Sequence, residues 1–314
     1  MVILPWRGLL YYTYSMTLYT NQSTNIRKTW VLMAIFLSLI IFLGWFLGVM
    51  YHNSAILYIA VIFSLLMNIA SYWYSDKIVL AMAGARPALH DEYTELYHLV
   101  ENLSITAGLP MPMIFIIEDS APNAFATGRN KDHAVVAVTT GLLRILNRSE
   151  LEGVLAHELS HIGNRDILLS TVVVVLVGMV TIISDMAFRA SFFRGGDSDN
   201  RGQLGTIIMI VGVVMLILSP FIATIIQLAI SRKREFLADS SGALLTRYPE
   251  GLAGALEKIG SYSAPLSHAN NAMAHLYISN PFGAKATKGI AKLFMTHPPI
   301  AERVALLRGM KQTG

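Results

Sequence analysis

The chain has 314 residues, of which 54% are hydrophobic and only 14% are charged. Soluble domains carry about 25% charged residues, so this composition excludes an ordinary soluble enzyme and favours an integral membrane protein. The chain has no cysteine, which leaves His, Asp and Glu as ligands for any zinc site. The net charge of +4 is modest and the basic residues flank apolar runs, so we expect no nucleic-acid partner.

The first part of the chain has the pattern of a membrane hairpin. Residues 1–29 contain basic but no acidic residues and no small-residue cleavage site, so we do not interpret them as a signal peptide. Two uncharged apolar runs follow, at 30–51 and 55–75, with a short turn between them. Each run is long enough to cross a bilayer as a helix, which predicts a transmembrane hairpin over 30–75.

Residues 76–166 change to the pattern of a soluble α+β segment. A helix is predicted over 90–107, ended by Gly108, with an apolar face made of Leu96, Leu99, Val100 and Leu103. Strands are predicted at 113–117 and 133–138, with a turn-rich and then extended segment at 121–128 and a short helix at about 140–146.

His157 and His161 lie four residues apart, with Glu158 directly after the first. In a helix this spacing places both imidazoles on one face, about one turn apart, where they can share a metal ion. Glu158 then lies where it can hold the attacking water and take its proton. This is the His-Glu-x-x-His pattern of zinc peptidases.

Several signals indicate that this segment is helical. Ser149 and Glu152 fit a capping box that begins the helix, and Gly163 offers an end. An apolar stripe, on the side away from the histidines, consists of Leu151, Leu155 and Leu159. One face is therefore expected to pack and the opposite face to hold metal.

Two more apolar runs, at 167–183 and 205–231, predict a second membrane hairpin over 167–231. Pro220 predicts a kink in the fourth run. Residues 232–314 are soluble in character again, with helices predicted around 236–247, 250–261 and 299–308.

A catalytic zinc site usually has three protein ligands and a water, so one further ligand is needed. A membrane hairpin returns to the side that it left, which brings Glu235 back to the two histidines. Asp239, one turn on, is expected behind the ligands, accepting a hydrogen bond from a ligand histidine or from Arg165 or Arg234. The short connections to the apolar runs place the site within roughly 20 Å of the membrane boundary.

The distribution of positive charge predicts the orientation in the membrane. Basic residues flank the apolar runs on the catalytic side, at Arg27, Lys28, Lys77 and 232–234. The positive-inside rule therefore places both catalytic segments in the cytoplasm. Three arginines in the second turn argue the other way, which leaves open whether the third and fourth runs are full spans: Arg189, Arg194 and Arg201.

These motifs resemble the HtpX-type membrane zinc metalloproteases, relatives of the CAAX prenyl proteases. The matching segments are 157–166, 234–239 and 296–299 with Arg303, and the order of apolar and catalytic segments over 30–310 is also similar. The resemblance implies one Zn²⁺ per chain, held by His157, His161 and Glu235, with Glu158 as general base.

With the chain pattern, the resemblance implies a mainly helical, α+β membrane protein with four apolar helices and a zincin-like catalytic domain carrying a small β-sheet. It implies cleavage of damaged or misfolded membrane proteins beside the lipid bilayer, in the cytoplasm. Asn123, Ala124 and Phe125 are similar to the family's substrate-binding edge, along which a peptide would add as a strand. His297 is similar to a histidine near the substrate carbonyl.

Two other interpretations stay open. One is a CAAX-type prenyl-protein endopeptidase, for which four apolar runs are few. The other is a non-catalytic membrane scaffold or transporter with a structural metal, whose site would be closed by four protein ligands. A fourth ligand would favour the scaffold, and the remaining candidates are His90, His98, His133, His268 and His275.

Overall fold

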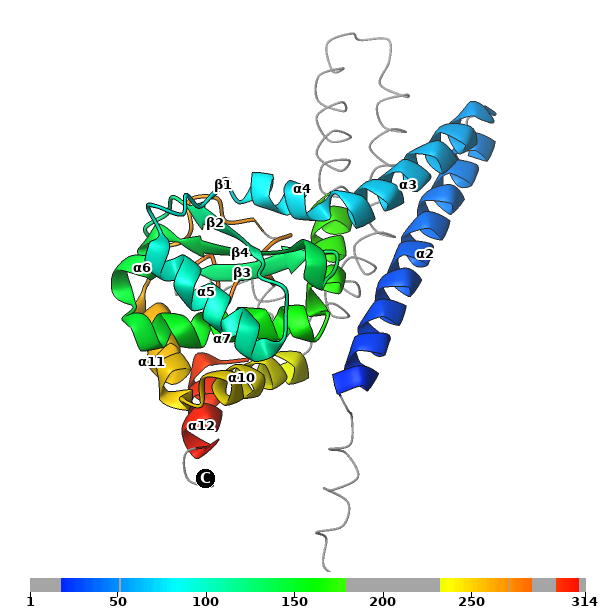
Figure 1. The fold of residues 1–314 in the computed structure, drawn as a ribbon. Helices are drawn as coiled ribbons and strands as arrows, with labels where there is room; N and C mark the ends of the chain where they lie inside the picture. Colours follow the sequence, from blue (N-terminus) through cyan, green and yellow to red (C-terminus); the bar gives the residue numbers. More distant parts are fainter. Residues whose placement is uncertain (1–17, 51, 179–231, 271, 284–297, 311–314) are drawn as a thin grey trace, which may run out of the picture.

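The computed structural model describes residues 18–50, 52–178, 232–270, 272–283 and 298–310. Two long helices form a hairpin, and beside it lies an α/β unit formed by residues 85–163 and 232–310 (Figure 1). The predicted fourth apolar run and His297 lie outside the described residues.

The hairpin consists of α2 (Leu18–Met50) and α3 (Ala55–Trp73). Within them, Ser23–Met50 and Ala55–Trp73 are long and apolar enough to cross a membrane, which confirms two apolar helices where the first hairpin was predicted. The predicted boundary at residue 30 is wrong, because the helix already runs from Leu18. Residues 18–29 contain neither Gly nor Pro, so nothing in them stops a helix. A Cβ on Gly44 would collide with the Cβ of Ala60, so glycine lets the two helices approach closely.

Only part of the predicted four-helix membrane domain lies in the described residues. The helix Asp166–Gly178 follows α7 (Arg148–Gly163) at an angle of 85°. If these two helices together form one bent span, the described residues contain three candidate spans. The described residues of this third run are mostly buried within the protein, including Val172, Val173 and Val174. Within the described residues, two helices are therefore long and apolar enough to span a membrane, and the prediction of four is confirmed only for the first two.

A four-stranded mixed sheet forms one layer of the α/β unit. Its strands are β1 (Ala85–Pro87), β2 (Met113–Ile117), β3 (Ala124–Gly128) and β4 (Ala134–Thr139), in the order β1-β2-β4-β3. Strands β2 and β4 are parallel and the other pairs are antiparallel. The two predicted strands and the extended segment are confirmed, whereas β1 and the short helix α4 (Ser75–Met82) before it were not predicted. Strand β3 lies at the edge of the sheet, which matters for the site below.

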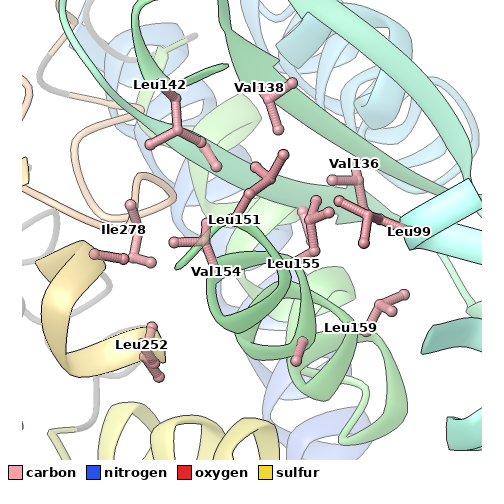
Figure 2. Packing of buried hydrophobic residues seen from close by; sticks show 14 of the residues in the cluster. Leu99, Val136, Val138, Leu142, Leu151, Val154, Leu155, Leu159, Leu252 and Ile278 are labelled. Atoms are coloured by element: carbon pink, nitrogen blue, oxygen red, sulfur yellow. The ribbon is translucent and has the colours of Figure 1, made fainter. Parts of the chain in front are cut away.

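Helix α7 lies between the sheet and the last three helices (Figure 1). Around it are α5 (Thr94–Ala107), the 3₁₀ turn Lys131–His133, α6 (Thr140–Ile145), α10 (Arg232–Thr246), α11 (Pro249–Ser261) and α12 (Ile300–Met310). The predicted stripe of Leu151, Leu155 and Leu159 is buried together with sheet residues Val136 and Val138 (Figure 2). These contacts fix the rotation of α7 about its axis, and hence the face that carries the histidines.

The helix begins two residues earlier than predicted. Its capping box pairs Asn147 with Glu150, through Glu150 N–H to Asn147 Oδ1 at 3.0 Å and Asn147 N–H to Glu150 Oε2 at 2.8 Å. The predicted capping pair of Ser149 and Glu152 is wrong. It has the same spacing as the observed pair, so spacing alone could not distinguish them. The N-cap is Asn147, whose backbone is extended, and Ser149 lies inside the helix.

Side chains from the opposite face of the sheet and from the hairpin belong to one buried cluster. Phe36 of α2 belongs to the same buried cluster as Phe125, Val135 and Val173. The middle of the apolar helix α2 and the sheet therefore belong to a common core, which also contains Leu168–Leu169 and Val172–Val174.

Candidate metal centre

Helix α7 places two imidazoles within contact of each other. The Nε2 atoms of His157 and His161 lie 3.2 Å apart, with the ring planes at 90°. His157 is buried and His161 is partly buried. The two side chains lie on one face of the helix, as predicted.

Glu235 comes to the same point from the first turn of α10. Its Oε2 lies 3.8 Å from His157 Nε2, and its Oε1 lies 3.6 Å from His161 Nε2. One atom from each of the three residues can be chosen so that all lie within 4.8 Å of one another. Ligands about 2.0 Å from a tetrahedral zinc are about 3.3 Å apart, so these separations suit such an ion. The structure brings together the three residues predicted as ligands.

A buried carboxylate orients the His157 ring. Its Nδ1 lies 2.9 Å from Asp239 Oδ1, and Asp239 accepts two further hydrogen bonds from Arg303, at 2.8 and 2.6 Å. Burial disfavours the charged Asp239, but Arg303 and the His157 hydrogen bond outweigh it and lower the pKa of Asp239 to about 2. Burial lowers the pKa of His157 to about 4, so this ring is neutral at pH 7. Its Nδ1–H then donates to Asp239, which leaves Nε2 for a metal.

A second carboxylate orients the His161 ring. His161 Nδ1 lies 3.1 Å from Asp166 Oδ2. Burial opposes the charged His161, but the Asp166 hydrogen bond and the charge of Glu235 outweigh it and raise the pKa of His161 to about 9. Asp166 was not among the predicted site residues, although it follows His161 by only five positions. The signal available in the sequence was an acidic residue just after the metal helix.

The arginines predicted behind the site take other places. Arg234 Nη1 lies 3.6 Å from Asp166 Oδ1, so its carboxylate neighbour is Asp166 and not Asp239. Arg165 is exposed, has a left-handed backbone with φ 56°, and lines a different surface hollow with Ser160. The partner of Asp239 is Arg303, which the sequence had indicated only as part of a resemblance.

Glu158 points into a small cavity beside the three ligands. The lining includes His157, His161, Glu235 and Ala126, and the volume of about 30 Å³ suits a water molecule but not a peptide. Among the described residues, Glu158 Oε1 is buried and has no hydrogen-bond partner. Burial raises the pKa of Glu158 to about 7. A carboxylate in this state can exchange a proton near neutral pH.

The predicted substrate edge is covered by the chain itself. Asn123 Nδ2 donates to the Ser279 carbonyl at 3.2 Å, and the Ala124 carbonyl accepts from the Ile278 N–H at 3.0 Å. The Phe125 ring contacts the Tyr277 ring edge to face. Asn123, Ala124 and Phe125 are therefore buried under residues 277–279, because the open side of an edge strand pairs with the nearest extended segment. Two positions after Ala124, Ala126 lines the cavity instead.

The described residues contain one group of His, Asp or Glu side chains that could hold a metal, and it has three members. His275 lines the cavity, but its Nε2 lies 3.1 Å from the Ser170 carbonyl. The scaffold interpretation requires a site closed by four protein ligands, whereas this group has three.

Comparison with known proteins agrees with this geometry. The family described as "Peptidase family M48" matches residues 91–311. The chain belongs to peptidase family M48. It is 47% identical over 299 residues to the "Protease HtpX homolog" of Thermoanaerobacter pseudethanolicus, covering 94% of this chain and 98% of the relative. It is 44% identical to the Streptococcus gordonii protein of the same name, and the match covers 93% of this chain and 100% of the relative.

Among solved structures, the M48 chain is similar to S. mikatae Ste24p, with a TM-score of 0.47 and 19% identity, covering 92% of this chain and 67% of that one. The predicted resemblance to HtpX-type proteases is confirmed by the sequence matches. This M48 chain, with its two apolar helices, is a membrane-bound metalloprotease.

Proposed function

We propose that this protease is a zinc-dependent endopeptidase with His157, His161 and Glu235 as its metal ligands. The observation that carries the proposal is the approach of Glu235 to both Nε2 atoms, at 3.8 and 3.6 Å. Two imidazoles and one carboxylate are a donor set of catalytic zinc, and they leave a fourth position for water or substrate.

The residues around the ligands have distinct tasks. Zn²⁺ bound here would polarise the scissile carbonyl and lower the pKa of water toward 7. Glu158 takes the proton of the attacking water and later gives it to the leaving amine, for which its pKa of about 7 suits both directions. Asp239 and Asp166 hold the two imidazoles with Nε2 toward the ion.

The substrate is an extended polypeptide that pairs with β3 beside Glu158. Ala126 lines the cavity, and its backbone N–H and C=O belong to the set that faces away from β4, as those of Ala124 do. Extension of the peptide toward Asn123 requires residues 277–279 to move. Only an unfolded segment can add as a strand, which supports damaged or misfolded membrane proteins as substrates.

The site works next to the membrane, on its cytoplasmic side, in a multi-pass chain. Basic residues flank the hairpin at Arg27, Lys28 and Lys77, which supports this orientation. The proposal also includes the sequence-based prediction that His297 lies near the substrate carbonyl.

Digestion of casein by the purified full-length protein in detergent tests the proposal. We expect cleavage that a chelator stops and added zinc restores. Glu158→Gln should retain zinc and lose activity by roughly 10²- to 10⁴-fold, because it removes the base and no ligand. Glu152→Gln, on the same helix and away from the cavity, is the matched control and should be fully active. Full activity of Glu158→Gln would refute the base, and cleavage that ignores the chelator would refute the metal.

A further inference from the structure

The start of α2 reaches the metal centre. Asn25 lies in the first turns of this helix, near the start of the stretch Ser23–Met50, and only 4% of its surface is exposed. Its Nδ2 donates to Asp166 Oδ1 at 2.6 Å and lies 3.3 Å from the Asn164 carbonyl. A side chain of the membrane hairpin therefore contacts the carboxylate that orients a predicted metal ligand.

Asp166 uses its two oxygens for two different partners. Oδ1 accepts from Asn25, and Oδ2 lies 3.1 Å from His161 Nδ1. A carboxylate rotates easily about its last bond, since that torsion has broad minima. A short hydrogen bond to one oxygen limits this rotation and keeps the other oxygen on the imidazole.

Arg234, a second neighbour of Asp166, holds the carboxylate less well than Asn25 does. Arg234 Nη1 is 3.6 Å from Oδ1, which is too long for a hydrogen bond. Because the Asn25 amide is neutral, it adds no positive charge to that of Arg234 beside Asp166. A neutral donor at this position orients the carboxylate without adding a charge that competes with the imidazole.

We propose that Asn25 is a positioning residue for the metal centre: through Asp166 it fixes the His161 ring, so that docking of the membrane helix α2 raises the affinity for zinc. This inference rests on the proposed function, in which His161 is a ligand. The first hairpin is then more than an anchor, because it supplies the outermost support of the ligand set.

Zinc affinity of the full-length protein in detergent tests the link. Competition with a colorimetric chelator gives the Kd for zinc, and transfer to excess chelator gives the rate of release. Removal of the direct outer partner of a metal ligand, here Asp166, typically costs 10- to 100-fold in affinity. Asn25 acts one step further out, so we expect Asn25→Ala to weaken zinc binding by up to about tenfold, the lower end of that range. Asn25→Gln, which keeps the amide, should recover part of this loss. At saturating zinc, the KM for casein should stay unchanged.

The matched control is Asn68→Ala in the same hairpin, where the amide donates to the Ser64 carbonyl of its own helix. It should leave the Kd for zinc unchanged. If Asn25→Ala fails to fold, Asn25→Leu replaces it, since leucine has a similar size and no donor.

A double-mutant cycle with Asp166→Ala decides between positioning and simple docking. If Asn25 acts through Asp166, Asn25→Ala should add no further loss of zinc affinity in the Asp166→Ala background. If Asn25 only attaches α2 to the Asn164 carbonyl, one of two results is expected. Either the losses of zinc affinity caused by Asn25→Ala and Asp166→Ala multiply, or Asn25→Ala lowers the unfolding temperature and leaves the Kd for zinc unchanged. Either result would overturn the proposed role of Asn25. The proposed function would still stand if the wild type shows zinc-dependent proteolysis. A wild type that binds no zinc would overturn both.

Discussion

The two histidines lie one turn apart on α7, yet they are supported by different parts of the molecule. The first group, the His157 arm, consists of His157, Asp239 and Arg303. The second, the His161 arm, consists of His161, Asp166, Asn25 and Arg234. The His157 arm is built from α7, α10 and α12, whereas the His161 arm includes a residue of the membrane hairpin.

The two arms also differ in burial and charge. Neither Asp239 nor Arg303 has any exposed side-chain surface, and Arg303 also donates to the Ile278 carbonyl at 3.0 Å. The His161 ring is 16% exposed, and the closest donor to its carboxylate is a neutral amide. The comparison teaches that one histidine is oriented by a closed ion pair inside the α/β unit, while the support of the other includes Asn25 of the apolar helix α2, on which we propose that its position depends.

Breaking the ion pair of the His157 arm should have the largest effect on stability. Arg303→Ala leaves Asp239 charged and buried, which should cost about 3–5 kcal/mol in the free energy of unfolding. Thermal unfolding in detergent measures it. Arg308→Ala is the control on the same helix, because its ion pairs are exposed, and its unfolding temperature should hardly change. Equal effects of the two changes would contradict the closed pair.

Moving α10 away from α7 should disturb the His157 arm next most. A Cβ on Gly242 would lie 2.9 Å from the backbone nitrogen of His157, so Gly242→Ala must shift α10 and with it Glu235. We expect a loss of about 1–3 kcal/mol in stability, as overpacking usually costs, together with weaker zinc binding. Gly163→Ala, whose Cβ would meet only the Leu109 side chain at 3.8 Å, is the control. Unchanged zinc affinity in Gly242→Ala would show that the helix spacing does not position the ligands.

The base between the two arms should give the activity its pH dependence. Glu158 must be ionised to accept a proton, and burial raises its pKa to about 7. A cation nearby favours the ionised form, so the midpoint should lie at or below about 7. Below the midpoint kcat/KM should fall about tenfold per pH unit, and above it the value should be level until another group titrates. A rate that rises as the pH falls would contradict this assignment.

The weakest member of the His161 arm should have the smallest effect. Arg234 lies 3.6 Å from Asp166 without a hydrogen bond between the two groups. Arg234→Ala should therefore weaken zinc binding by only about two- to fivefold, below the 10- to 100-fold that loss of a directly bonded outer partner costs, because no hydrogen bond to Asp166 is lost. The same competition assay measures it. A loss larger than that of Asn25→Ala would reverse the order of the two donors.

The grouping of His157, His161 and Glu235 could be predicted from the sequence. One helical turn relates His157 to His161, and Glu235 was expected beside them from the pattern of apolar runs over residues 167–231, most of which lie outside the described residues. The strands β2 and β4 and the helix ends at Gly108 and Gly163 also follow local rules of pattern and capping.

Asp239 was predicted behind a histidine and lies there, 2.9 Å from His157 Nδ1, but the residues that hold the two carboxylates could not be predicted, because no local pattern relates them. Arg303 lies 64 residues beyond Asp239, and Asn25 lies 141 residues before Asp166. Strand β1 has three residues, too few for an alternating pattern, and it depends on pairing with β2. The cover of residues 277–279 over β3 likewise depends on tertiary contacts, of which the hydrogen bond from Ile278 to Ala124 is one.

Zinc content of three purified full-length proteins tests the central claim most directly, namely that Glu235 completes the centre begun by His157 and His161. Wild type and Glu158→Gln should each hold about one zinc per chain after dialysis against metal-free buffer, while Glu235→Gln should lose most of it, since one of three ligands is gone. Full zinc content in Glu235→Gln, with Glu158→Gln depleted instead, would contradict the account.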